Sequence, residues 1–190
     1  MRRRLVLASA SLRRREIMKS LGWSFIVMAA DIDESGNAGE TPCDMALRLA
    51  RTKAASVSLR TGSEWTIGAD TVVDVDGVAF GKPMDREDAR RMLGILSGRS
   101  HLVHTGVAVA SSGEILASCA ETTSVTFGRL SDGEINGFAD SGDGDDKAGA
   151  YAIQGKGALL VERIDGCYYN VVGLPVFRLS RMLEEMENER

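Results

Sequence analysis

The sequence predicts an α/β domain, and two kinds of pattern support that prediction. Short runs of apolar and β-branched residues, typical of buried strands, begin near residues 5, 66 and 100. Between them lie longer segments in which apolar residues recur at helical spacing. With 190 residues, of which 44% are hydrophobic and 26% charged, the chain can fill one core. We therefore expect a single domain over residues 1–190.

The first sixty residues predict two strands and two helices. A short apolar strand over 5–8 leads into a helix over 12–21, for which Ser11 has the residue type of an N-cap. A second strand is expected over 23–30. The pair Thr41-Pro42 then opens a helix that reaches about residue 59, because proline suits the first helical turn and apolar residues follow at helical spacing.

The middle of the chain predicts a helix between strands. Residues 66–73 have the composition of a buried strand, and 85–96 has the apolar spacing of an amphipathic helix. Two long strands over 100–110 and 115–127 follow. The sequence S-S-G-E over 111–114 is typical of a hairpin turn, so these two strands should pair.

The last third predicts two helices and two short strands. A Ser-x-x-Glu capping box at 131–134 marks the start of a helix over 130–139. Strands are expected over 158–164 and 168–172. A final helix starts at 173–175 with its proline in the first turn, and an apolar stripe docks it to the sheet.

Asp70 is an unusual residue for the strand in which it lies. Aspartate is depleted in strands, and an ionised carboxylate buried without a partner is costly. Asp70 therefore needs a cation nearby, and a Gly-Lys-Pro turn carrying Lys82 follows the strand. Gly68 and Ala69 would let another group approach the backbone just before it. The alternative is that Asp70 ends the strand and accepts hydrogen bonds from a neighbouring turn.

A candidate anion site follows the first strand. Ser9 and Ser11 precede a helix N-terminus, where free backbone N–H groups and the helix dipole favour negative charge. Arg13 and Arg14 lie in the first helical turn, where positive charge opposes the dipole, so their position makes sense if they face a phosphate. Alternatively, they are solvated surface arginines.

Carboxylates also gather after the second expected strand. Asp31, Asp33 and Glu34 repel one another unless a cation relieves them. Their oxygen atoms suit Mg²⁺ or Mn²⁺ better than zinc, although an ordinary polar loop would have the same composition. Arg48 and Lys53 lie on the next helix, off its apolar face, where they can reach either a ligand or water.

The segment over 147–157 combines small residues with Lys147 and Gln154. Glycines and alanines at this density indicate backbone that passes close to a bound ring or phosphate. A glutamine amide can both donate to and accept from the edge of a base. The alternative is a plain glycine-rich loop.

Two other candidate metal sites are rejected. The acidic run over 140–146 lacks the closing glutamate of a calcium-binding EF-hand loop. His101 and His104 lie three residues apart in an expected strand, so they point to opposite faces. We therefore expect both histidines to be structural.

Composition and missing motifs exclude several functional classes. A net charge of −4 argues against binding to nucleic acid, and neither a P-loop nor a dinucleotide-binding glycine motif is present. The basic start at 1–4 precedes an apolar run too short for an export signal, and no later stretch could span a bilayer. Cys43, Cys119 and Cys167 are widely spaced, which suits a reducing compartment. We expect a cytoplasmic protein with neither nucleic-acid nor membrane partners.

Several motifs follow one another in order from residue 7 to about 183. They are L-A-S-A-S-L-R-R-R, the Asp33-Glu34 pair, A-R-T-K-A, G-A-D-T-V-V, G-K-P, L-S-G-R-S-H-L-V-H-T-G-V, D-K-A-G-A-Y-A-I-Q-G and N-V-V-G-L-P. Together they closely resemble the Maf family of nucleoside triphosphate pyrophosphatases. One departure is Leu12, where the family usually has proline. Proline would pre-set the first helical turn, so the change loosens this loop but removes no charged group.

The resemblance implies hydrolysis of a nucleoside triphosphate between its α- and β-phosphates, with Mg²⁺ or Mn²⁺ as the divalent cation. The D-K-A-G-A-Y-A-I-Q-G form resembles the branch that acts on dTTP and UTP. The family's fold is a mixed, twisted central sheet flanked by helices, with two lobes around a deep nucleotide cleft, commonly in a homodimer. The alternatives are the same chemistry on non-standard nucleotides or 7-methyl-GTP, and a nucleotide-binding regulator of cell division.

The resemblance also assigns roles by position. Asp70 matches the family's proton acceptor, and we expect Glu34 and Asp70 to hold the metal. Because a carboxylate bound to a cation is a weaker base, one role of Asp70 trades against the other. The positions that match base-specificity residues are Arg13, Thr71 and Gln154. The polar positions expected around the nucleotide are Ser11, Arg14, Glu34, Lys53, Lys82 and Lys147.

Overall fold

The computed structural model describes residues 4–62 and 64–189. Residues 1–3 of the basic start, Ser63 in the turn after the second expected helix, and Arg190 of the charged tail lie outside the described residues.

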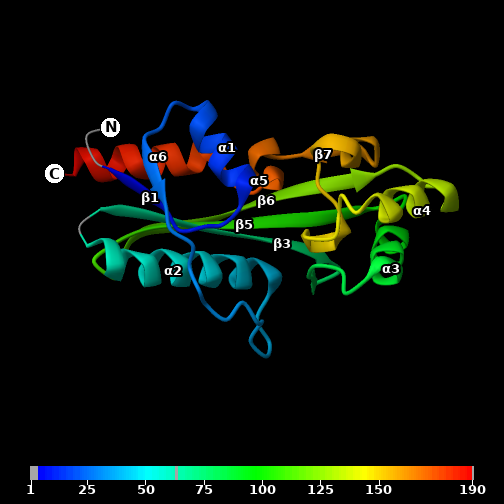
Figure 1. Cartoon of the computed structure of the whole chain (residues 1–190), viewed down its shortest axis with the longest axis horizontal. Helices are drawn as coiled ribbons and strands as arrows, with labels where there is room; N and C mark the ends of the chain where they lie inside the picture. Colours follow the sequence, from blue (N-terminus) through cyan, green and yellow to red (C-terminus); the bar gives the residue numbers. More distant parts are fainter. Residues whose placement is uncertain (1–3, 63, 190) are drawn as a thin grey trace.

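A mixed seven-stranded sheet runs through the chain (Figure 1). Its spatial order is β2-β1-β3-β5-β6-β7, and β4 pairs with β3. β1 pairs in parallel with β2 and β3, whereas the other pairs are antiparallel, so the predicted mixed α/β sheet is confirmed. The strands are β1 (Leu5–Leu7), β2 (Phe25–Val27), β3 (Trp65–Val75), β4 (Val78–Phe80), β5 (Ser100–Ser111), β6 (Glu114–Phe127) and β7 (Val161–Asp165).

Helices cover both faces of the sheet. In Figure 1, α2 lies on one side of the long strands, and α1, α5 and α6 lie on the other. The predicted N-caps at Ser11 and Ser131 are confirmed, including the capping box with Glu134. The helix expected to open at Thr41-Pro42 starts at Pro42, with Thr41 as its N-cap. The helices are α1 (Leu12–Ser20), α2 (Pro42–Thr61), α3 (Arg86–Leu96), α4 (Asp132–Ser141), α5 (Tyr168–Val172) and α6 (Val176–Asn188), with 3-10 turns at Ala148–Ala150 and Gly155–Leu159.

The strand prediction over 168–172 is wrong, because these residues form helix α5. The side-chain amide of Asn170 donates to the Val103 carbonyl and to Thr123 Oγ1, both at 2.9 Å. These long-range bonds anchor a helical turn despite its strand-like composition. The strand expected over 158–164 is also shorter, since a 3-10 turn occupies 155–159 and β7 starts at 161.

Helix α2 packs directly onto the backbone of β3 and β5. A Cβ atom on Gly68 would lie 2.2 Å from the carbonyl oxygen of Ala50, and one on Gly106 would lie 2.3 Å from that of Ala46. The group whose approach Gly68 was predicted to permit is therefore the α2 backbone. This contact fixes how the residues of α2 lie relative to β3.

One edge of β3 is unpaired in its middle, and this gap separates two apolar cores. On this edge β3 pairs with β1 at 65–67 and with β4 at 73–75, so 68–72 has no partner among the described strands. One core, with α1, α5 and α6, contains Leu7, Ile67 and Leu179. The other, with α3 and α4, contains Val73 and Phe127.

Candidate active site

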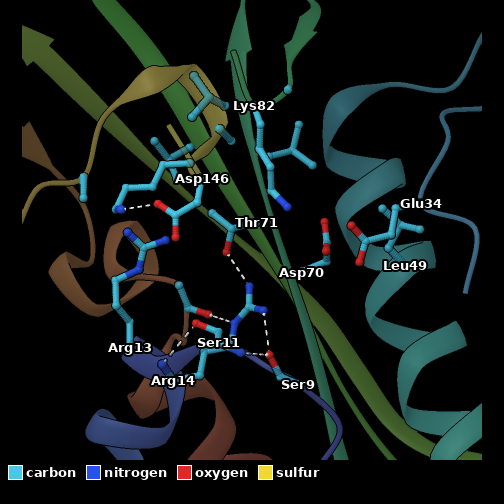
Figure 2. Close-up of a pocket in the computed structure, with 18 of the residues that line it drawn as sticks. Ser9, Ser11, Arg13, Arg14, Glu34, Leu49, Asp70, Thr71, Lys82 and Asp146 are labelled. Atoms are coloured by element: carbon cyan, nitrogen blue, oxygen red, sulfur yellow. Dashed lines mark hydrogen bonds and ion pairs between the residues drawn. The ribbon is translucent and has the colours of Figure 1, made fainter. Parts of the chain in front are cut away.

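A cavity of about 1070 Å³ lies at the gap between the two cores, which is large enough for a small-molecule ligand. Its wall includes Ile153 and Val172 from one core and Val73 from the other. Most of the predicted site residues meet there (Figure 2). The predicted residues that line the cavity are Ser11, Arg13, Arg14, Glu34, Lys53, Asp70, Thr71, Lys82 and Lys147.

Gln154 is the predicted site residue that the structure does not bring into this lining. It is exposed and lies directly after Ile153, which does line the cavity. Its role in base specificity stays a prediction.

Asp70 has the cationic partner that its sequence context demands. The ammonium Nζ of Lys53 lies 2.5 Å from Asp70 Oδ1 and 2.5 Å from Glu34 Oε1. Lys53 and Asp70 are only 7% and 9% exposed, whereas the side chain of Glu34 is 54% exposed. The direct partner is thus a residue of α2. Lys82 points toward Asp70 from across the cavity in Figure 2 but forms no ion pair within the described residues.

The environment of Glu34 favours its ionised form. Partial burial opposes the charge, but the hydrogen bond and charge of Lys53 and the charges of Lys82 and Arg14 together hold the pKa of Glu34 below its ordinary value. A carboxylate is therefore available at this position at neutral pH.

Arg14 is buried and joins three parts of the site. Its Nε donates to the Gly173 carbonyl at 2.7 Å, Nη1 to Ser9 Oγ at 3.2 Å, and Nη2 to Thr71 Oγ1 at 2.9 Å. Burial lowers the pKa of Arg14, opposed chiefly by the charge of Asp70, yet guanidinium groups stay protonated in proteins. Because three of its N–H groups bind the protein, only the remaining donors could reach a phosphate.

The loop between β1 and α1 ends in the expected N-cap, and its role as an anion site stays a prediction. Ser11 Oγ caps α1 by accepting from the Arg14 backbone N–H at 3.4 Å. The half-buried side chain of Arg13 points into the cavity in Figure 2 and has no ion pair within the described ranges. A free guanidinium beside a helix N-terminus suits a phosphate group.

Sequence reasoning missed Asp146, which lies beside Arg13 and also lines the cavity (Figure 2). Its carboxylate forms an ion pair with the ammonium of Lys147. The hydrogen bond from Lys147, with a smaller effect from the charge of Arg13, lowers the pKa of Asp146. The signal that could have identified Asp146 is its position directly before Lys147, which was expected to lie near the nucleotide.

Two lysine-bearing turns at the rim are joined. The backbone N–H of Gly149 donates to the Gly81 carbonyl at 3.0 Å, which connects the turn of Lys147 to that of Lys82. The small residues of this segment also serve close approach within the chain itself, since a Cβ on Gly157 would lie 1.9 Å from the Ala152 carbonyl oxygen. Close approach to a bound ring or phosphate stays a prediction.

Other charged groups noted in the sequence serve structural roles. Arg48 pairs with Glu40 at 2.6 Å, and its hydrogen bond lowers the pKa of Glu40 to about 2. As predicted, the histidines have separate partners: His101 Nε2 lies 2.7 Å from the Tyr151 hydroxyl, and His104 Nε2 lies 3.1 Å from Asp74.

The donor set fits a hard divalent cation. Glu34 and Asp70 direct carboxylate oxygens at one point, now held by the ammonium of Lys53. Within residues 4–62 and 64–189, no cluster of three or more His, Cys, Asp or Glu side chains could hold a metal by itself. Two carboxylates completed by substrate and water are typical of Mg²⁺, whereas zinc sites use more protein ligands.

Among the helices of the described ranges, none is both long enough and apolar enough to cross a membrane.

Comparison with known proteins gives matches over nearly the whole chain. The family model described as Maf-like protein matches residues 4–186. A dTTP/UTP pyrophosphatase of Geobacter sulfurreducens is 52% identical over 174 residues, covering 91% of each chain. A dTTP/UTP pyrophosphatase of Symbiobacterium thermophilum is 46% identical over 95% of this chain and 93% of the relative. Among solved structures, a HAM1 protein from Coxiella burnetii is 18% identical with a TM-score of 0.46, covering 67% of this chain and 74% of that one.

Proposed function

The chain belongs to the family of Maf-like proteins, and we propose that it hydrolyses dTTP and UTP to the monophosphate and pyrophosphate. The observation that carries this proposal is the identity of 46–52% to dTTP/UTP pyrophosphatases over more than nine-tenths of both chains. The cavity supports it, because carboxylates and cations suited to a metal–triphosphate meet there.

We propose that Asp70 accepts a proton from the attacking water. Its carboxylate is nearly buried on the central strand β3, so it can orient a water toward a bound phosphate. Water adds to phosphorus, the anhydride bond between the α- and β-phosphates breaks, and pyrophosphate leaves with the electron pair. A bound Mg²⁺ or Mn²⁺, held by Glu34 and Asp70, would neutralise phosphate charge and polarise the phosphoryl oxygens.

The cations of the cavity would then stabilise the leaving group. Arg13, Lys82 and Lys147 line the cavity from different segments and can offset the charge that develops on pyrophosphate. Arg14 acts mainly as a positioning residue, since it ties the β1–α1 loop to β3 and to Gly173. We assign the base preference to Arg13, Thr71 and Gln154.

A panel of nucleoside triphosphates, each assayed for pyrophosphate release with Mg²⁺ or Mn²⁺, tests the proposal. Release should be fastest with dTTP and UTP and should stop when EDTA removes the metal. Faster release from 7-methyl-GTP or from non-standard nucleotides would refute the preference for dTTP and UTP, while hydrolysis to monophosphate and pyrophosphate would stand. Binding without release from any triphosphate would favour a regulatory protein.

We further propose a cytoplasmic homodimer with nucleoside triphosphates as its substrates. Cys43, Cys119 and Cys167 are free thiols, which suits a reducing compartment. Light scattering on the purified protein should give twice the chain mass of 20.4 kDa, and a mass of one chain would refute the dimer.

A further inference from the structure

A lysine occupies the point at which the two candidate metal-binding carboxylates converge. Lys53 Nζ contacts Asp70 and Glu34 at equal distances of 2.5 Å, and no other cation pairs with either carboxylate within the described ranges. A divalent ion that binds Asp70 Oδ1 and Glu34 Oε1 has to displace the ammonium, because two cations on the same oxygens repel strongly at that separation. Lys53 and a metal therefore compete for these two oxygens.

The two sides of this site differ in packing and exposure. Lys53 and Asp70 come from α2 and β3, which are locked together by the contact at Gly68. Glu34 lies in the irregular segment between β2 and α2, and its side chain is half exposed. Lysine has a flexible four-carbon stem, so its ammonium can swing away without movement of α2.

We propose that Lys53 is a resident counter-ion that blocks free divalent metal from the Glu34–Asp70 site and yields only to metal that arrives with a triphosphate. The phosphates then supply the ammonium with a new anionic partner within reach of the cavity. Substrate and metal would thus enter together, and in the empty cavity both carboxylates would stay paired with the single ammonium. The inference rests on the proposed function for its triphosphate, but its central claim concerns metal affinity alone.

Electron paramagnetic resonance of Mn²⁺ without nucleotide tests the claim on the full chain. Wild-type protein should bind Mn²⁺ weakly, and Lys53→Gln should bind it roughly tenfold more tightly or better, because charged hydrogen bonds to both carboxylates no longer have to be displaced. Lys53→Met keeps the apolar stem of lysine and should behave alike, so it carries the test if the glutamine variant fails to fold. Adding a non-hydrolysable dTTP analogue should tighten Mn²⁺ binding in the wild type.

Lys82→Gln is the matched control, since it removes the same charge from the same cavity and Lys82 acts on Glu34 only through space. It should change Mn²⁺ affinity by less than about threefold. Unchanged Mn²⁺ affinity in the folded Lys53 variants, or an equal gain in Lys82→Gln, would overturn the proposal. Because no turnover is measured, an absence of pyrophosphate release would refute the enzymatic function while leaving this result intact.

Discussion

Replacing Gly68 with alanine tests whether the contact between α2 and β3 sets the position of Lys53 against Asp70. The new Cβ would lie 2.2 Å from the Ala50 carbonyl oxygen and 2.6 Å from the Ala54 backbone nitrogen. Ordinary contacts are longer, so α2 must move away by about 1 Å. Overpacking of this kind costs about 1–3 kcal/mol, which corresponds to a fall in Tm of about 2–12 °C for a chain of this size.

The displacement should also reduce activity, although no functional group is removed. A shift of about 1 Å at a catalytic group can cost about a hundredfold in rate. Thermal unfolding by circular dichroism and kcat/KM for pyrophosphate release from dTTP measure the two effects. The control is Gly94→Ala, since Gly94 is exposed in α3 with no atom within 4 Å of an added Cβ. Alanine there should stabilise the helix by about 0.5–1 kcal/mol and leave kcat unchanged. Wild-type stability and activity in Gly68→Ala would refute the reasoning.

Three further predictions concern single side chains. Asp70→Asn should lower kcat by roughly 10²- to 10⁴-fold while a non-hydrolysable dTTP analogue still binds in calorimetry, and unchanged turnover would remove Asp70 from its role. Gln154→Ala should change the ratio of kcat/KM between dTTP and purine triphosphates by roughly tenfold without altering metal dependence, whereas an equal loss for all nucleotides would contradict a role in base choice. Burial, with the charge of Arg99, lowers the pKa of His101 to about 4 from 6.5. The His101 imidazole therefore takes up a proton less readily in the folded state than in the unfolded state. The contribution of His101 to the free energy of unfolding is full above pH 6.5 and falls by about 3 kcal/mol as the pH drops toward 4. Urea unfolding of His101→Gln at pH 7 and 4.5 should show a smaller loss between the two values than the wild type, and an equal loss would disprove the assignment.

Local rules of sequence were sufficient for much of the fold. Ser11 and Ser131 cap their helices because a hydroxyl satisfies free backbone N–H groups wherever a helix starts. The hairpin over 111–114 forms because Ser112 and Gly113 adopt the positive φ values of a two-residue turn. Such features depend on neighbours in sequence and can be predicted without tertiary contacts.

The partner of Asp70 depended on tertiary packing. Its need for a cation followed from charge and burial, but Lys53 lies 17 residues away on a helix. Which helical face meets β3 is decided by the bare backbone at Gly68 and Gly106. The same limit explains the wrong prediction over 168–172, where contacts of Asn170 with β5 and β6 outweigh local propensity.

The hydrogen bond from Gly149 to Gly81 has a mechanical consequence for the mouth of the cavity. Because this bond links the turns that carry Lys82 and Lys147, the two turns form one unit. Neither turn can move away from the cavity by itself without breaking the bond. Any widening of the entrance on this side must swing both charges outward together. Exchange of the Gly149 amide proton with solvent requires this bond to open, so its exchange rate reports on the separation of the two turns.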